Sequence, residues 1–495
     1  MPNATIIPFE LPLPQVLPTI EGNVDYRQLR QQLLHIDALL LTSGLETRLM
    51  EKDLARWLGQ RQRVGAKAQQ NHQRHCRRAL RCNLARLLLA EDFRGFAARL
   101  ADSPLLQYFC GISEVLCITV PSKSTLERYD KWWPQADIGQ AVRELLSVGA
   151  ATPEKLPLAE AVDLESAFLD TTCLSANIHY PVDWVLLRDA TRTLIKAMQL
   201  IRDRGLKHRM EEPKSFLTRI NRLCIQMTHA SRKTDRQRHR KQTLRQMDRL
   251  VGTVRNHARR YRQLLAHRWP QTDWSQAQAQ QVLRRIDGVL EQLPQACKQA
   301  RQRILQDQPV ANDEKILSLY EPDVHVIVRN KAGAEVEFGN TLFLAENPQG
   351  LILDWELFQE SAPADSALLP WSVGRMEKVY GPKLKAVAAD RGFDNEANRV
   401  GLAQEGIYNA VCPRSPQQLR ERSGSWKFKR LQRRRGQTEG RISIVKNLFL
   451  KGRMRSKGFE HRALTLTWTV LVHNLWVLAR MQLRAPAAQP KARAA

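Results

Sequence analysis

The sequence lacks cysteines spaced for metal binding or for a dense disulfide framework. Its eight cysteines are scattered through 495 residues, and no two of them form a Cys-x-x-Cys pair. Structural zinc sites and small disulfide-rich domains both depend on closely spaced cysteines, so neither is expected here. Scattered cysteines are typical of a reducing compartment, which predicts a cytoplasmic protein.

Long apolar segments and a cleavable leader are also lacking. The most apolar stretch, Ala463–Ala479, is too short to cross a bilayer and is interrupted by His473 and Asn474. The first 18 residues have neither a basic start nor a cleavage site. We therefore expect no membrane span, no secretory signal and no membrane partner.

Acidic residues are scarce relative to basic ones. The chain carries 77 Lys and Arg against 50 Asp and Glu, a net charge of +27 at pH 7. The excess is concentrated in residues 183–318, with net +16, and residues 414–462, with net +13. Localised positive charge favours the binding of a polyanion, most commonly a nucleic acid. The length and the 43% hydrophobic content predict a folded protein of several domains.

The first third of the chain is predicted to be helical. Residues 1–24 are rich in proline and are expected to be extended, whereas leucines recur every three or four residues after them. Within residues 25–150, either Ser122 or Ser124 can cap a short helix. We interpret 25–150 as a helix-turn-helix-like DNA-binding domain, and a plain helical core with ordinary surface charge fits the same pattern. The candidate DNA contacts on the short helix are Lys123 and Arg128.

A strand is predicted next. Residues 164–170 are a short apolar run that ends in Asp170. A carboxylate at the carboxyl end of a strand is a usual place for chemistry in an α/β sheet. We therefore assign residues 151–182 to the first part of a catalytic core.

Residues 183–318 are predicted to form a basic helical insertion. Apolar residues recur in an a/d seam from Leu244 to Leu265, and a second stripe from Val282 to Leu293 predicts an antiparallel helical hairpin. Arginines crowd the outer face of the first helix, which favours nucleic-acid contact over a merely solvated surface. The candidate DNA contacts there are Arg255, Arg259 and Arg260.

Residues 319–482 are predicted to complete the catalytic core. Short alternating runs indicate an antiparallel meander with a turn at Lys331-Ala332-Gly333. The apolar run Leu384–Ala389 is another short strand, and an acid, Asp390, directly follows it.

The C-terminal end is predicted to be a helix and a tail. A helix over Leu464–Leu478 is expected to pack on the sheet, with His473 and Asn474 as core polar residues. Residues 483–495 are rich in Ala, Pro, Lys and Arg and are expected to be disordered.

One acid stands almost alone in the second basic region. On a helix with about 100° per residue, Glu439 lies about 40° from Arg435, and Lys446 lies about 20° from Arg435. A carboxylate and two cations therefore share a face. Such an acid can bind a divalent metal while its neighbours hold phosphates. A solvated basic helix with one intrahelical Arg–Glu pair explains the same spacing.

Asp170, Asp390 and Glu439 together predict a metal site. Carboxylates that converge on one point suit Mg²⁺, because hard cations prefer oxygen ligands. Paired metal ions can activate a water or a 3′-hydroxyl and stabilise the leaving oxygen in phosphodiester displacement. The residue patterns leave other acids open as ligands, namely Asp163, Glu165, Asp183, Asp354, Asp394 and Glu396.

Three segments resemble the catalytic motifs of bacterial insertion-sequence transposases of the DDE class. The first is Asp170-Thr171-Thr172 followed by Asn177-Ile178-His179-Tyr180-Pro181, and the second is Ala388-Ala389-Asp390-Arg391-Gly392-Phe393. Arg435, Glu439 and Lys446 match the third signature, Tyr-x2-Arg-x3-Glu-x6-Lys, whose tyrosine position is Gln432 here. The resemblance spans about residues 25–480.

The resemblance implies a fold and a site. The fold is α/β, with an RNase H-like mixed-sheet catalytic core that a long helical insertion interrupts, after an N-terminal all-helical DNA-binding domain. Asp170, Asp390 and Glu439 would hold two Mg²⁺ or Mn²⁺ ions. Arg435 and Lys446 would contact phosphates near the cleaved bond.

The function that the resemblance implies is DNA transposition. The protein would bind the terminal inverted repeats of an insertion sequence, hydrolyse phosphodiester bonds there, and join the 3′-hydroxyls to target DNA. Double-stranded DNA and a second copy of the chain would be its partners, in the bacterial cytoplasm with the nucleoid.

Three other interpretations stay open. A nucleic-acid-binding protein without activity explains the charge but not the placement of the three acids. An RNase H-like nuclease without strand transfer would use the same acids. An inactive relic of a transposase would keep the motifs, and Gln432 in the tyrosine position leaves that interpretation open.

Overall fold

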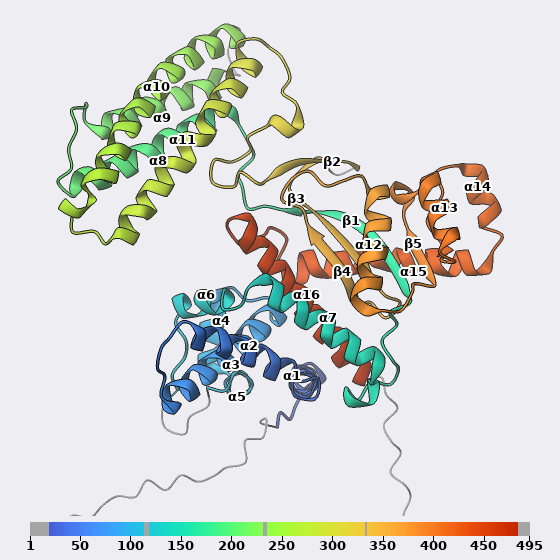
Figure 1. Cartoon of the computed structure of the whole chain (residues 1–495). Helices are drawn as coiled ribbons and strands as arrows, with labels where there is room; N and C mark the ends of the chain where they lie inside the picture. Colours follow the sequence, from blue (N-terminus) through green and yellow to red (C-terminus); the bar gives the residue numbers. More distant parts are fainter. Residues whose placement is uncertain (1–18, 113–117, 231–234, 332–333, 484–495) are drawn as a thin grey trace, which may run out of the picture.

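The computed structural model describes residues 19–112, 118–230, 235–331 and 334–483. These residues form a mixed α/β structure that is mostly helical, with one mixed six-stranded sheet (Figure 1). The α/β class and the mixed sheet are therefore confirmed. Residues 1–18 of the expected extended segment 1–24, the turn residues Ala332 and Gly333, and residues 484–495 of the expected tail lie outside the described residues. Leu483, the first residue of the tail expected over 483–495, is helical instead.

The sheet is built around its first strand. β1 pairs antiparallel with β3 on one side and parallel with β5 on the other, and the strand order is β2-β3-β1-β5-β6 with β4 also paired to β3. The predicted meander is confirmed as β2, β3 and β4, which pair antiparallel. The strands are β1 (Ser166–Ser175), β2 (His325–Lys331), β3 (Ala334–Glu346), β4 (Ile352–Leu357), β5 (Ala386–Ala389) and β6 (Tyr408–Asn409).

β1 continues past the end that the sequence predicted for it. The strand expected over 164–170 was to end at Asp170, whereas β1 runs on to Ser175 and Asp170 lies in its middle. The later residues stay in the sheet because they pair with β3, while the parallel pairing with β5 stops at Leu169 opposite Ala389. Asp170 is therefore the first residue of β1 beyond its neighbour β5.

Among the described residues, seven α-helices precede β1, which confirms the prediction of a helical first third. They are α1 (Val24–Thr42), α2 (Leu45–Gly59), α3 (Ala66–Leu88), α4 (Phe93–Asp102), α5 (Pro104–Cys110), α6 (Lys123–Asp130) and α7 (Gln135–Ala151). Ser122 is the residue that caps α6, because its side chain accepts a hydrogen bond from the Thr125 amide at 3.3 Å.

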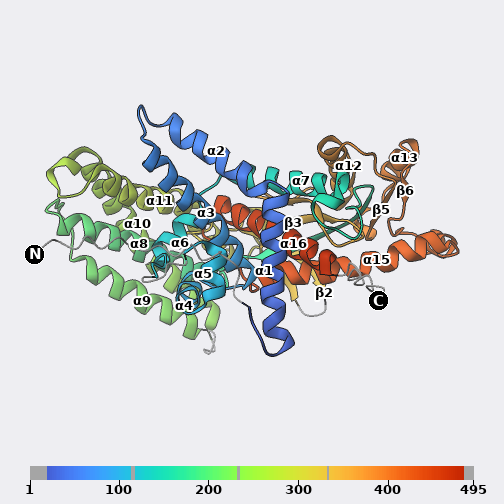
Figure 2. The same cartoon turned by 90° about the horizontal axis from the view of Figure 1, so that it is seen from below.

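The C-terminal helix α16 (Phe459–Leu483) lies between these helices and the sheet (Figure 1). Figure 2 shows α1 crossing it, and one hydrophobic core runs from the N-terminal helices through α16 to the sheet. Asn474 hydrogen-bonds through its side chain to both the amide and the carbonyl of Ile352 in β4. The predicted packing of this helix on the sheet is confirmed, and Asn474 is a satisfied core residue.

Four helices between β1 and β2 form a bundle with a hydrophobic core of its own. They are α8 (Asp183–Asp203), α9 (Pro213–His229), α10 (Arg236–Arg268) and α11 (Gln276–Ile304), and Figure 1 shows them set apart from the sheet. The predicted hairpin is α10–α11, whose seam from Leu244 to Leu265 is buried. The sequence did not resolve α8 and α9, which complete the bundle.

The remaining helices surround the parallel part of the sheet. They are α12 (Asp365–Tyr380), α13 (Glu396–Gln404), α14 (Pro416–Arg422) and α15 (Trp426–Ser443), and α15 continues into a π-helical segment, η6 (Ile444–Phe449). Lys446 lies in that segment, so the predicted spacing of about 100° per residue holds for Arg435 and Glu439 but does not extend to Lys446. None of the described helices combines the length and low polarity that a bilayer crossing requires.

Candidate active site

Asp170, Asp390 and Glu439 line one cavity of about 770 Å³. Leu169 of β1 and Ala389 of β5 are register partners, so the residues after them, Asp170 within β1 and Asp390 just past β5, lie side by side. Glu439 reaches the cavity from α15, which packs against both strands. Three elements that are distant in the sequence therefore bring a carboxylate each to the same place.

The carboxylates influence one another electrostatically. Burial, together with the negative charges of Asp390 and Glu439, raises the pKa of Asp170 to about 6, although the Thr171 amide and the Arg435 guanidinium act to lower it. The Thr171 amide donates to Asp170 Oδ1 at 2.8 Å, and the Gly392 amide donates to Asp390 Oδ1 at 2.9 Å. The site thus concentrates negative charge that local hydrogen bonds offset only in part.

The three carboxylates are suitable ligands for a hard divalent cation. Among the described residues, no three His, Cys, Asp or Glu side chains already close around one point as a metal-binding group. The three acids nevertheless offer only carboxylate oxygens, the ligand type that Mg²⁺ and Mn²⁺ prefer. A cation between them would relieve the repulsion that raises the pKa of Asp170.

Two cations accompany the acids. Arg435 is close enough to Asp170 to lower its pKa, and its Nε is buried without a hydrogen-bond acceptor among the described residues. Lys446 lines the cavity, and its Nζ lies 3.4 Å from Thr172 Oγ1 in β1. Both predicted phosphate contacts therefore lie beside the acids.

A fully buried acid fixes the helix that carries Glu439. Glu346, at the end of β3, is 0% exposed and accepts hydrogen bonds from Arg434 and Thr438, both at 2.8 Å. Arg441 lies 3.7 Å from the same carboxylate and packs against Gly350, where any Cβ would come within 2.6 Å of its guanidinium. At about 100° per residue, these three α15 residues lie roughly 60° to 160° round the helix from Arg435 and Glu439, so the contact with β3 sets which face turns to the cavity.

Gln432 also holds α15 to the sheet. Its Nε2 donates to the carbonyl of Ala389, the residue before Asp390, at 3.1 Å, and to the carbonyl of Ala410 after β6. The glutamine in the tyrosine position of the signature therefore bridges the ends of two parallel strands to the helix of Glu439.

The competing acids have other roles in the structure. Five of them hold ion pairs or turns away from the three central carboxylates, and none of the six lines their cavity. The partners are Arg375 and Ser372 for Asp354, Arg399 for Asp394, Arg303 and Gln299 for Asp183, Lys385 for Glu165, and the amides of Glu165 and Ser166 for Asp163.

Two acids of the cavity, Glu360 and Asp365, were missed by the sequence interpretation. Asp365, the first residue of α12, accepts a hydrogen bond from Thr171 Oγ1 at 3.0 Å. A Cβ at Gly392 would lie 2.5 Å from Asp365 Oδ2 and 3.1 Å from Asp390 Oδ1, so this glycine lets two carboxylates approach each other. An acid in the first turn of a helix is so common that its position gave no distinguishing signal.

The other predicted DNA contacts lie away from the cavity. Arg255, Arg259 and Arg260 are on α10 of the helical bundle, where Arg259 and Arg260 are exposed. Lys123 and Arg128 are exposed on α6, where Lys123 pairs with Glu127 at 2.9 Å. The structure therefore brings Arg435 and Lys446 to the acids and leaves the other five basic residues on separate surfaces.

No family model, curated protein or solved structure matches the chain.

Proposed function

We propose that this protein is a transposase of the DDE class with an RNase H-like catalytic core. It cuts DNA at the ends of an insertion sequence and joins the freed 3′-hydroxyls to target DNA. The observation that carries the proposal is the meeting of three carboxylates in one cavity: Asp170 from β1, Asp390 directly after β5, and Glu439 from α15. The mixed sheet and the motif resemblance support it.

In this proposal Asp170, Asp390 and Glu439 hold two Mg²⁺ or Mn²⁺ ions. Such ions, when bound, make water or a 3′-hydroxyl nucleophilic at neutral pH and offset charge on the leaving oxygen. Asp170 must lose its proton to act as a ligand, and its raised pKa makes that step depend on pH near 6. Glu346 and Gln432 act through α15, because they fix the face from which Glu439 extends.

The cations beside the acids orient the substrate in this proposal. Arg435 and Lys446 contact the phosphates that flank the cleaved bond, which lets a polyanion approach a cluster of carboxylates. The basic face of α10, with Arg255, Arg259 and Arg260, holds DNA farther from the chemistry by contacts to the backbone. Duplex DNA and a second copy of the chain on it are the proposed partners.

A cleavage and joining assay tests the proposal. The substrate is a plasmid that carries the DNA flanking the gene on both sides, where the proposal places the inverted repeats, with Mg²⁺ or Mn²⁺ as the metal. We expect nicking at the repeat ends and transfer of those ends to a second plasmid. Asp390→Asn should abolish both reactions, whereas Glu360→Gln, which removes the same charge from the cavity wall, should retain them.

The outcomes separate the competing functions. Nicking without joined product would indicate a nuclease. Binding of the repeats without nicking by either metal would indicate a nucleic-acid-binding protein. Full activity of Asp390→Asn would show that the carboxylate cluster does not carry the reaction.

A further inference from the structure

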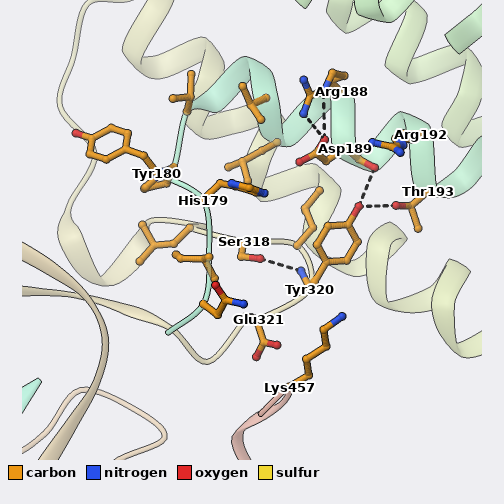
Figure 3. A pocket seen from close by; sticks show the side chains of 18 of the residues that line it. His179, Tyr180, Arg188, Asp189, Arg192, Thr193, Ser318, Tyr320, Glu321 and Lys457 are labelled. Atoms are coloured by element: carbon orange, nitrogen blue, oxygen red, sulfur yellow. Dashed lines mark hydrogen bonds and ion pairs between the residues drawn. The ribbon is translucent and has the colours of Figure 1, made fainter. Parts of the chain in front are cut away.

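A second hollow lies at the root of the helical bundle. It has a volume of about 480 Å³ and is lined by the two segments that join the bundle to the sheet, by the start of α8, and by the loop before α16 (Figure 3). It contains the motif segment Asn177–Pro181, which does not line the cavity of the three acids. β1 ends at Ser175, two residues before Asn177, and at about 3.3 Å per residue that end lies about 16 Å from Asp170.

The wall of this hollow carries positive charge that the protein does not neutralise. Both acids of the lining are engaged, Asp189 with Arg188 at 2.8 Å and Glu321 with the buried Arg462. Three further basic residues have no ion-pair or hydrogen-bond partner among the described residues. They are Arg192 and Lys196 on α8 and Lys457 in the loop before α16.

A half-exposed aromatic ring lies among these cations. Tyr320 is 54% exposed, yet its hydroxyl hydrogen-bonds to Thr193 Oγ1 at 2.6 Å and donates to the Asp189 carbonyl at 3.2 Å. Figure 3 shows Tyr320 with Lys457 on one side and Thr193 at its hydroxyl end, while Tyr180 points away from them. The two hydrogen bonds hold the ring of Tyr320 in one orientation, and about half of the residue stays exposed. A base could therefore stack on the ring without a further loss of side-chain freedom.

We propose that this hollow binds an unpaired stretch of a DNA strand. Arg192, Lys196 and Lys457 contact its phosphates, and one base stacks on Tyr320. Open aromatic rings beside a basic groove are the usual means of holding single-stranded nucleic acid. A duplex is disfavoured because its bases are stacked on each other and present no free face to a ring.

This inference rests on the proposed function, since it takes DNA to be the polyanion, and it adds a second contact to the active site. The hollow is shared between two parts of the protein, because Arg192 and Lys196 belong to the bundle and Lys457 precedes α16. A strand bound there would fix the bundle relative to the sheet at a distance from the cleaved bond.

The test uses the full chain with EDTA, so that no cleavage can occur. Fluorescence anisotropy measures binding of a labelled oligothymidylate and of a duplex without repeat ends, across a range of salt concentrations. Tyr320→Ala should weaken binding of the single strand about 10-fold, because it removes stacking with one base. Tyr320→Phe, which keeps the ring, should bind nearly as the wild type does.

A triple variant tests the cations. Arg192→Gln, Lys196→Gln and Lys457→Gln together should lower the slope of log K against log salt by about 2, since each phosphate contact on a single strand contributes about 0.7. The matched control removes one arginine and two lysines from exposed positions elsewhere on the bundle, as Arg222→Gln, Lys214→Gln and Lys298→Gln. It should leave that slope closer to the wild-type value.

Two results would overturn the inference. One is unchanged oligothymidylate affinity for both Tyr320→Ala and the triple variant. The other is an equal loss for the duplex, which would make the hollow a general anion surface. Circular dichroism reports whether each variant is folded, so a loss of duplex binding is interpreted only for folded variants. Because the measurement needs no metal, its failure leaves the plasmid assay unaffected, and failure of the plasmid assay leaves this result intact.

Discussion

Removing the charge of Asp170 should stabilise the protein when no metal is bound. The carboxyl group is held where burial and two neighbouring acids raise its pKa from 3.8 to about 6. At roughly 1.4 kcal/mol per pKa unit, holding this group ionised in the folded state costs about 3 kcal/mol. Asp170→Asn keeps the shape and removes the charge, so we expect a gain of up to about 3 kcal/mol in the free energy of unfolding at pH 8.

The gain should depend on pH in a definite direction. The folded protein binds this proton more tightly than the unfolded chain does, so the wild type is most stable, in this respect, below pH 3.8. That stability is lost as the pH rises through 6. The difference between Asp170→Asn and the wild type should therefore be full at pH 8 and small near pH 4.

Thermal unfolding with EDTA and with Mn²⁺ measures the effect. Mn²⁺ should raise the melting temperature of the wild type by binding the folded state, and should raise that of Asp170→Asn much less. Asp394→Asn is the control, and it should destabilise the protein, because hydrogen bonds from Arg399 lower the pKa of Asp394 and so stabilise its ionised form. A less stable Asp170→Asn at pH 8 in EDTA would refute the view that the three carboxylates repel one another.

Three further outcomes are expected. Glu439→Gln should reduce cleavage at least 100-fold and leave repeat binding within a factor of about 2, by gel shift. Glu346→Gln should lower cleavage and raise the Mn²⁺ concentration needed for it, because α15 loses its contact with β3. An unchanged Mn²⁺ requirement would show that Glu346 contributes only to the stability of the fold. Reversing the charges of Arg255, Arg259 and Arg260 should flatten the salt dependence of duplex binding, and an unchanged slope would make that face merely solvated.

The sequence predicted the elements whose signals are local. The helices before β1, the α10–α11 hairpin and the meander follow from apolar periodicity and turn residues, and the structure contains all of them. Asp390 was placed correctly at the end of a strand, since an apolar run and a glycine enclose it. Within α15, Arg435 and Glu439 follow regular helical spacing, which a sequence shows directly.

Features that depend on distant partners could not be predicted. β1 extends past Asp170 because β3, more than 150 residues later, pairs with it as far as Ser175. The anchoring of α15 by Glu346 and the approach of Asp365 to Asp390 likewise arise from tertiary contacts. The π-helical segment that carries Lys446 has no sequence signature in the 3.6-residue period.

The position of α16 governs when the nascent chain can fold. The first seven helices share their core with a helix that begins more than 300 residues after α7 ends, so they cannot complete their packing until that helix has been made. The bundle of α8–α11 has its own core and can fold earlier, which brings the ends of β1 and β2 together before the sheet closes. A truncation that removed α16 would therefore damage the core of the first seven helices as much as that of the sheet.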